Sequence, residues 1–318
     1  MTELRSRAPA DAAGAPLCDW LARRFTYFDA AGWRAQLAAG RVQLDGRVAA
    51  GDERLGAGAE VVFTPAAAAP SGRPAPAVLF EDAWLVAVDK PAHAVAHRDG
   101  AFVQHTFLHD LERQLGAASP LHLVHRLDRE TSGVLLLARE PATVTAVQAQ
   151  FTAGQVEKRY LALVRGVVAD DAVVIDAPIG SAGSAIRHRQ AVLAAGTRGA
   201  RSARTELRVV ERFAEHTLVA LTPRTGRTHQ LRVHLAHLGH AIEGDVLYGE
   251  DEACYLAFTA HLKQGGDPRW PAGRKAGRQL LHAQQLALRH PRSGAALVLE
   301  ATPPAEFLAA LAALGPRH

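Results

Sequence analysis

Charged side chains crowd the segment HRLDRETSG at residues 125–133, directly before the apolar run Val134–Ala138. The run predicts a buried strand, and a loop entering such a strand holds its side chains in fixed positions at the end of a sheet. Arg126 and Arg129 flank Asp128, so the carboxylate should stay ionised and could act as a nucleophile or a base. The alternative is that Asp128 only caps a turn while both arginines are solvated.

A second polar group lies in TGRTHQLRVHLAHLG, residues 225–239, which predicts a helix that begins after Thr228 as N-cap and ends at Gly239. The segment carries Arg227, His229, Arg232 and His234. On a helix, His229 and Arg232 share a face, and so do Arg227, Leu231 and His234. The alternative is an amphipathic helix with a polar face.

Tyr160 lies in EKRYLALVRG, an alternating segment that predicts a strand, next to Lys158 and Arg159. A flat ring among cations suits stacking on a nucleic-acid base. An ordinary sheet tyrosine is the other interpretation.

Short strands interspersed with helices are predicted around these segments. The strands do not alternate strictly with helices, which favours an α+β domain with a mixed, mostly antiparallel sheet flanked by helices. Strands are expected within 77–91, 133–139, 157–166, 205–213, 216–223 and 286–301, and helices within 107–116 and 142–154.

The chain divides into four parts. The polar, Ala/Pro-rich residues 1–14 predict a disordered tail, and 15–64 predict a small α/β module with a hairpin turn at Asp45–Gly46. The Pro/Ala/Gly-rich residues 65–77 are typical of a linker. Residues 78–312 are expected to form the large, catalytic domain.

Composition excludes several classes of protein. Hydrophobic residues make up 48% of the 318, enough for a sizeable core, and the net charge of +4 permits a polyanionic partner. Two cysteines, Cys18 and Cys254, cannot build a disulfide framework or a Cys-rich zinc site. No signal peptide or membrane-spanning run is found, so we expect a cytoplasmic protein with no membrane partner.

Four segments resemble, in order, the motifs of the large RNA pseudouridine synthase family that includes the RluA-type enzymes. They are HRLDRETSGVLLLAR, KRYLALVRG, TGRTHQLRVHLAHLGHAIEGDVLYG and LLHAQQLAL, and VLFEDAWLVAVDKPAHAVAH resembles the opening of that domain. The resemblance spans roughly residues 78–302. The N-terminal module resembles the alpha-L RNA-binding domain of a small-subunit ribosomal protein, with its basic residues thinned to Arg34, Arg41 and Arg47.

The resemblance implies an isomerase that converts specific uridines in structured RNA to pseudouridine after flipping the base out of its stack. Asp128 matches the essential aspartate of the family, as nucleophile or base. Tyr160 matches the tyrosine that stacks on the flipped base, and Arg232 matches the arginine paired with the acid.

Four further residues are expected to bind substrate. Arg126 matches an arginine that fills the space left by the flipped base, and Leu281 matches an apolar residue that walls the uracil pocket. Arg227 and His229 lie in the same motif as Arg232, with phosphate contact as their candidate role. The family uses no metal and no nucleotide cofactor, and neither phosphate-binding glycine motif is present.

The resemblance leaves the RNA open: ribosomal RNA is favoured, transfer RNA is a second candidate, and the protein is expected to be a monomer. Residues 250–279 form an insertion with Arg269, Arg274, Lys275 and Arg278, and 185–205 are also basic. Each predicts either a basic surface loop that contacts phosphates or a solvated variable loop.

The sequence argues against three rival functions, a kinase, a metal site and a glycosidase, and leaves one main alternative. HRDG at 97–100 is similar to the start of a kinase catalytic loop. The asparagine that should follow it is missing, and the chain has no glycine-rich phosphate loop. Helical geometry spreads His229, His234, His237 and His240 around the axis, which argues against a metal site. A glycosidase needs two opposed carboxylates, and Glu130 is too close to Asp128 in sequence. The main alternative is a non-catalytic RNA-binding or ribosome-assembly factor on the same fold.

Overall fold

A computed structural model describes residues 3–25, 28–51, 53–64, 76–94, 107–116, 120–263 and 276–315. The chain forms two compact units, Met1–Ala75 with Val95–Ala118 and Pro76–Ala94 with Ser119–His318. Of the predicted linker, residues 65–75 lie outside the described residues, as do 97–100 of the rejected kinase motif.

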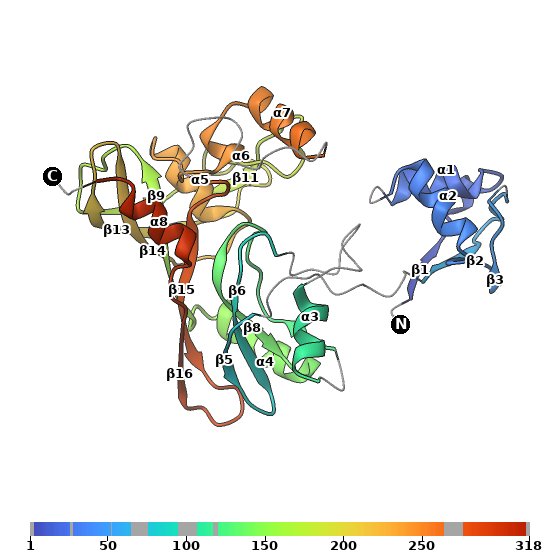
Figure 1. Ribbon diagram of the computed structural model, residues 1–318, viewed down its shortest axis with the longest axis horizontal. Coiled ribbons are helices and arrows are strands. Elements are labelled where there is room, and N and C mark those ends of the chain that lie inside the picture. Colours follow the sequence, from blue (N-terminus) through green and yellow to red (C-terminus); the bar gives the residue numbers. More distant parts are fainter. Residues whose placement is uncertain are drawn as a thin grey trace. The chain divides into compact units, whose positions relative to one another are not determined.

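The first unit contains a four-stranded sheet in the order β1-β4-β2-β3 and two helices against it (Figure 1). Its elements are β1 (Leu4–Arg7), a short 3-10 turn Ala10–Ala12, α1 (Leu17–Arg24), α2 (Ala30–Ala38), β2 (Val42–Leu44), β3 (Arg47–Val48), β4 (Glu60–Phe63) and α3 (Phe107–Gln114). Trp33 is fully buried in the core of this unit, and the Asp29 carboxylate caps α2 by accepting from Gly32 N at 2.7 Å. The predicted hairpin turn at Asp45–Gly46 is confirmed by the pairing of β2 with β3.

The prediction of a disordered tail over residues 1–14 was wrong for the residues that the structure describes, 3–14. β1 pairs antiparallel with β4, with Leu4 opposite Phe63 and Arg7 opposite Glu60. Main-chain hydrogen bonds form whatever the side chains are, and an edge strand needs only one apolar face. Leu4 supplies that face by packing against the core, while the charged residues face solvent.

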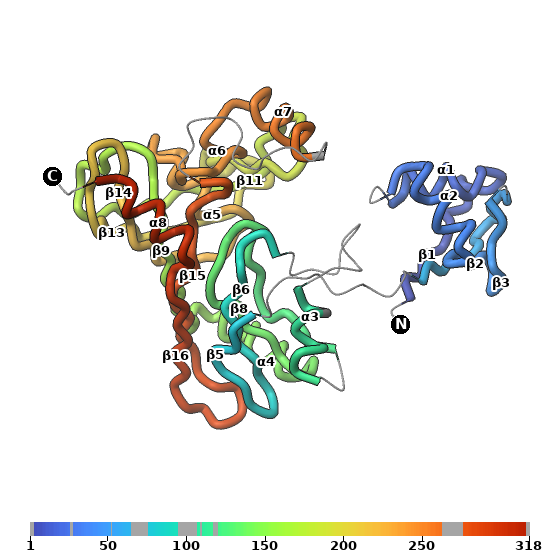
Figure 2. The backbone as a smooth tube through the Cα atoms, in the orientation of Figure 1, coloured from blue at the N-terminus to red at the C-terminus, as the bar shows by residue number. Residues whose placement is uncertain are grey.

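The second unit is built on one mixed sheet in the order β10-β13-β14-β9-β15-β8-β6-β5, with β16 paired to β15 and β7 to β8 (Figures 1 and 2). Neighbouring strands are antiparallel except β8 and β15, which run parallel, so the predicted α+β class and mixed sheet are confirmed. The strands are β5 (Val78–Glu81), β6 (Leu85–Lys90), β7 (His122–Leu123), β8 (Ser132–Ala138), β9 (Glu157–Arg165), β10 (Ala172–Asp176), β13 (Arg204–Arg212), β14 (His216–Pro223), β15 (Leu281–Arg289) and β16 (Ala296–Glu300), with a separate hairpin of β11 (Ile179–Ser181) and β12 (Gln190–Val192).

Helices cover both faces of this sheet. The unit contains α4 (Pro141–Thr152), α5 (Gln230–His237), α6 (Val246–Gly249), α7 (Glu252–Lys263) and α8 (Ala305–Ala312). Alternation along β9 separates two cores: Ala162 packs with Leu235 of α5, and Leu163 packs with Phe307 of α8. Helices α5 and α8 therefore lie on opposite faces of the sheet.

β8 is buried along its whole length, as the apolar run predicted. Gly133 has φ +109°, and a Cβ built there would lie 2.2 Å from the Ala283 carbonyl oxygen of β15. Only glycine allows this backbone and this close approach. The parallel pairing that anchors the loop before β8 therefore depends on Gly133.

Two local predictions were wrong. Helix α5 begins at Gln230, not after Thr228, because the Gln230 side chain accepts from Thr225 Oγ1 at 2.7 Å and Arg227 N at 3.0 Å and holds the preceding residues in a turn. The insertion 250–279 is not simply a loop, since α7 occupies Glu252–Lys263 and buries Phe258. Arg269, Arg274 and Lys275 lie outside the described residues.

Candidate active site

Asp128 lies in the loop between β7 and β8, and the Thr131 amide donates to the Asp128 carbonyl at 3.1 Å to close a turn. The fully buried Lys90 of β6 fixes this loop, because its ammonium donates to the Arg129 carbonyl at 3.1 Å and to two carbonyls of its own segment. Burial, reinforced by Arg278, lowers the pKa of Lys90 to about 7, although Asp128 opposes the shift. Lys90 therefore attaches the loop to strand β6 of the sheet.

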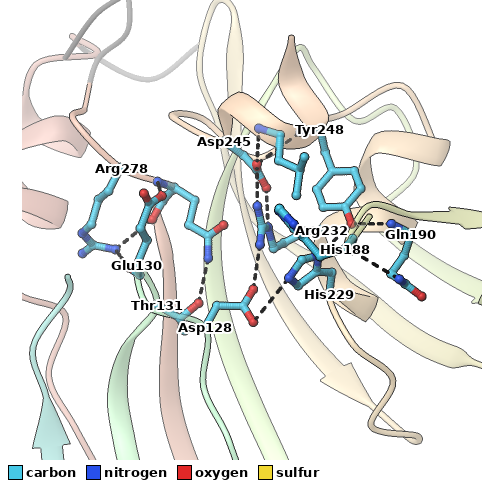
Figure 3. Close-up of polar contacts among 12 residues, drawn as sticks. Asp128, Glu130, Thr131, His188, Gln190, His229, Arg232, Asp245, Tyr248 and Arg278 are labelled. Carbon is cyan, nitrogen blue, oxygen red and sulfur yellow. Dashed lines mark hydrogen bonds and ion pairs between the residues drawn. The ribbon is translucent and has the colours of Figure 1, made fainter. Parts of the chain in front are cut away.

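Arg232 of α5 reaches Asp128 across the site (Figure 3). Its Nη1 donates to Asp128 Oδ2 at 2.8 Å, and its Nε and Nη2 donate to the two oxygens of Asp245 at 2.6 and 2.9 Å. Asp245 is buried and also accepts from the amides of Leu247 and Tyr248, which caps α6. One carboxylate thus holds both a helix start and the guanidinium that faces Asp128.

Electrostatics keep Asp128 ionised. Burial alone would raise the pKa of the Asp128 carboxyl, but the charge of Arg232, helped by His229 and by hydrogen bonds from Arg232 and Gln279, lowers it below its ordinary value. Burial opposes the charge of Arg232, yet Asp245 and Asp128 together raise its pKa. At neutral pH the pair is a carboxylate and a guanidinium.

His229 faces Asp128 from the start of α5, with Nε2 4.0 Å from Oδ1 (Figure 3). Its backbone is left-handed, with a φ of +56°. The Tyr248 hydroxyl accepts from Gln190 N at 3.0 Å and lies 2.8 Å from His229 Nδ1, so we assign the hydroxyl as donor to Nδ1 and the proton to Nε2. Burial and Arg232 lower the pKa of His229 to about 4, so it is neutral near pH 7.

The residues after Asp128 are tied to the segment before β15. Gln279 donates to Thr131 Oγ1 at 2.9 Å, and Arg278 donates to the Glu130 carbonyl at 3.0 Å. Arg278 is 1% exposed and also pairs with Glu306 at 2.6 Å, so its prediction as part of a basic surface loop was wrong. Its charge supports the Asp128 loop from within the protein.

A cavity of about 500 Å³ opens beside Asp128. All seven residues predicted to catalyse the reaction or bind substrate line it: Arg126, Asp128, Tyr160, Arg227, His229, Arg232 and Leu281. Tyr160 and Leu281 come from adjacent strands of the sheet, β9 and β15, and burial raises the pKa of Tyr160, which keeps the phenol protonated. His234, by contrast, is buried outside the cavity lining, where it bonds to Thr205 Oγ1 and the Ala177 carbonyl.

Sequence reasoning missed several residues that shape this site, among them Lys90, Asp245, Tyr248 and Gln279. The signal for Asp245 was available, because an aspartate directly before an apolar turn is typical of a helix cap. Its contact with Arg232 was not, since no short-range spacing relates the two.

Among the described residues, no group of three His, Cys, Asp or Glu side chains is placed to hold a metal ion. No helix within the same residues is long and apolar enough to cross a bilayer.

The arrangement defines an enzyme site in which an ionised carboxylate, oriented by a fixed guanidinium, faces a cavity whose lining includes five cationic side chains and the aromatic rings of Phe151 and Tyr160. Two human structures share the fold, RNA Pseudouridylate Synthase Domain Containing 1 (27% identity, TM-score 0.59, covering 79% of this chain and 91% of that one) and Domain Containing 4 (30%, 0.59, 75% and 92%). The fold is that of an RNA pseudouridine synthase.

Sequence comparisons agree with the fold. The RNA pseudouridylate synthase family model matches residues 84–237. A ribosomal large subunit pseudouridine synthase D of Xanthomonas campestris is 35% identical over 318 residues, covering 96% of this chain and 91% of the relative. A synthase D of Nitrosomonas europaea is 38% identical over 240 residues, covering 74% of this chain and 64% of the relative. Ribosomal large subunit pseudouridine synthase C of Escherichia coli is 34% identical over 224 residues, covering 70% of this chain and 65% of the relative. The chain belongs to the RNA pseudouridine synthase family, which confirms the resemblance drawn from its motifs.

Proposed function

We propose that this protein isomerises specific uridines to pseudouridine in structured RNA, with ribosomal RNA as the favoured substrate and transfer RNA as the second candidate. The observation that carries the proposal is the ionised Asp128, paired with Arg232 at 2.8 Å on the wall of a cavity that also contains Tyr160. The names of the relatives, ribosomal large subunit pseudouridine synthases, support ribosomal RNA. The alternative of a non-catalytic RNA-binding factor is not favoured.

The reaction needs no external reactant. The bond between C1′ of the ribose and N1 of uracil breaks, the base turns, a bond forms between C1′ and C5, and the proton from C5 leaves while N1 gains one. Atoms and electrons balance within the nucleotide. Asp128 acts as nucleophile or as base in this sequence, and Arg232 keeps it ionised and in position.

The remaining residues hold the flipped nucleotide. Tyr160 stacks on the uracil and Leu281 closes the pocket beside it. Arg126 is exposed at the cavity, where it fills the space that the base leaves in the RNA. Arg227 and His229 bind substrate from the loop before α5, and the neutral His229 does so as a hydrogen-bond donor.

The N-terminal module adds RNA affinity, and the protein acts in the cytoplasm as a monomer, without metal or nucleotide cofactor. Light scattering after size-exclusion chromatography tests the monomer. Deletion of residues 1–64 should weaken RNA binding, measured as a Kd, while the isolated catalytic unit keeps some activity.

The decisive experiment maps pseudouridine by carbodiimide-dependent primer extension on RNA from cells that lack the gene. Complementation uses the wild type, Asp128→Ala, and Asp171→Ala as matched control, because Asp171 is an exposed acid that pairs with Arg212 and does not line the cavity. A stop that returns with wild type and control, but not with Asp128→Ala, identifies the uridine and the acid together. A stop restored by Asp128→Ala contradicts the assignment.

A further inference from the structure

Lys158 lies on the same face of β9 as Tyr160, because residues two apart along a strand point to the same side. Both line the cavity. Arg159, between them, is exposed and does not line it. The strand therefore carries two neighbouring cations in different surroundings, one inside the site and one outside.

The Lys158 ammonium is half-buried and only partly satisfied. Its Nζ donates to the Thr225 carbonyl at 3.2 Å and lies 6.0 Å from the centre of the Phe151 ring. An ammonium has three N–H donors, so this carbonyl leaves two of them for another ligand. Within the described part of the chain no ion pair joins Lys158 to a carboxylate, and burial lowers its pKa.

The charges of the cavity favour an anion. Its lining contains one carboxylate, Asp128, and five cationic side chains, Arg126, Lys158, Arg224, Arg227 and Arg232. Arg232 is committed to Asp128 and Asp245, and Arg224 to Glu206.

We propose that Lys158 binds a phosphodiester group that flanks the target uridine, and so positions the nucleotide while Asp128 acts on its ribose and base. The inference rests on the proposed function. A phosphate oxygen can accept both remaining N–H bonds and neutralise the partly buried charge, which a uracil carbonyl cannot do. The same ammonium holds Thr225, so the loop that carries Arg227 and His229 is fixed by the residue that binds the phosphate.

The first test measures binding of a labelled large-subunit ribosomal RNA hairpin against salt concentration by fluorescence anisotropy. Lys158→Gln removes the charge and keeps an amide that can donate to Thr225; Arg159→Gln removes a charge one residue away on the other face. One lost phosphate contact should reduce the slope of log K against log salt by about one. We expect this for Lys158→Gln, a slope close to wild type for Arg159→Gln, and recovery in Lys158→Arg.

The second test neutralises the RNA instead. A methylphosphonate linkage is placed 5′ or 3′ of the loop uridine, with 2′-O-methyl sugars beside it. At one of the two positions the neutral linkage should weaken binding by wild type several-fold, and should weaken binding by Lys158→Gln no further. The proposal is overturned if, at both positions, the loss of affinity from the neutral linkage multiplies with the loss from Lys158→Gln. It is also overturned if a folded Lys158→Gln variant keeps the salt slope of wild type. The binding measurements need no turnover. If wild type binds the RNA but never modifies it, the proposed function fails, while the binding of wild type and Lys158→Gln can still be compared.

Discussion

Replacing Asp245 by asparagine should destabilise the protein and slow the reaction, although Asp245 does not line the cavity. Asparagine keeps the volume and the oxygen that caps α6, but it removes one of the two carboxylate charges that pair with the buried guanidinium of Arg232. Breaking a buried ion pair from one side costs about 3–5 kcal/mol. Because Arg232 keeps Asp128 at 2.8 Å, we expect the lower end, about 3 kcal/mol of the free energy of unfolding.

Urea unfolding monitored by fluorescence measures this loss, and Asp171→Asn is the control. The Asp171 side chain is 88% exposed and pairs with Arg212 at the surface, so its loss should change the free energy of unfolding by less than about 1 kcal/mol. A guanidinium that has lost the charge of Asp245 is held less firmly and orients Asp128 less well, so kcat should fall by up to about a hundredfold with little change in KM.

A double-mutant cycle separates the charge pair from other effects of the substitution. In an Arg232→Met background, Asp245→Asn has no guanidinium left to unpair, so its destabilisation should largely disappear. An Asp245→Asn variant within about 1 kcal/mol of wild type, or an undiminished effect in the Arg232→Met background, would refute the reasoning.

Three further outcomes are expected. Tyr160→Phe should keep kcat/KM within a few-fold, whereas Tyr160→Ala loses the stacking surface and about 1–3 kcal/mol of transition-state stabilisation, measured by kcat/KM on the mapped RNA. Burial lowers the pKa of both His125 and His229 from 6.5 to about 4 in the folded protein. Between these two pH values the unfolded chain therefore binds more protons than the folded one, and the free energy of unfolding should fall as the pH drops from 6.5 to about 4. Urea titrations at several pH values measure this, and a flat profile would contradict it. Gly133→Ala should lower the free energy of unfolding by about 3 kcal/mol or more, because its Cβ meets the β15 backbone, while Gly154→Ala, which has a positive φ but open space, loses far less.

Local patterns predicted the parts of the fold that short-range physics controls. The apolar run after Gly133 predicted a buried strand, and alternation around Tyr160 predicted its place on a strand, because both depend on side chains within a few residues. Such patterns cannot report a contact between distant segments. Arg278 was taken for a surface charge because arginine is rarely buried, but Glu130 and Glu306 give it partners from elsewhere in the chain.

Asp245 shows the same limit inside the site. Its local role, the helix cap, could be read from the residues that follow it, yet its contact with Arg232 depends on how α5 and α6 pack. The tail prediction failed for a related reason. Residues Leu4–Arg7 are polar on average, and their order comes from backbone pairing with β4, which lies more than fifty residues away.

The parallel pairing of β8 with β15 also decides when the enzyme becomes competent during its synthesis. Ser132 and His282 are 150 residues apart in sequence, so at about 5–20 residues per second the ribosome needs on the order of 8–30 s to make the chain between them. Until then the Asp128 loop lacks Gln279 and the strand beside it. A growing chain therefore carries Asp128 in an unassembled site until the segment with Gln279 and His282 has been made.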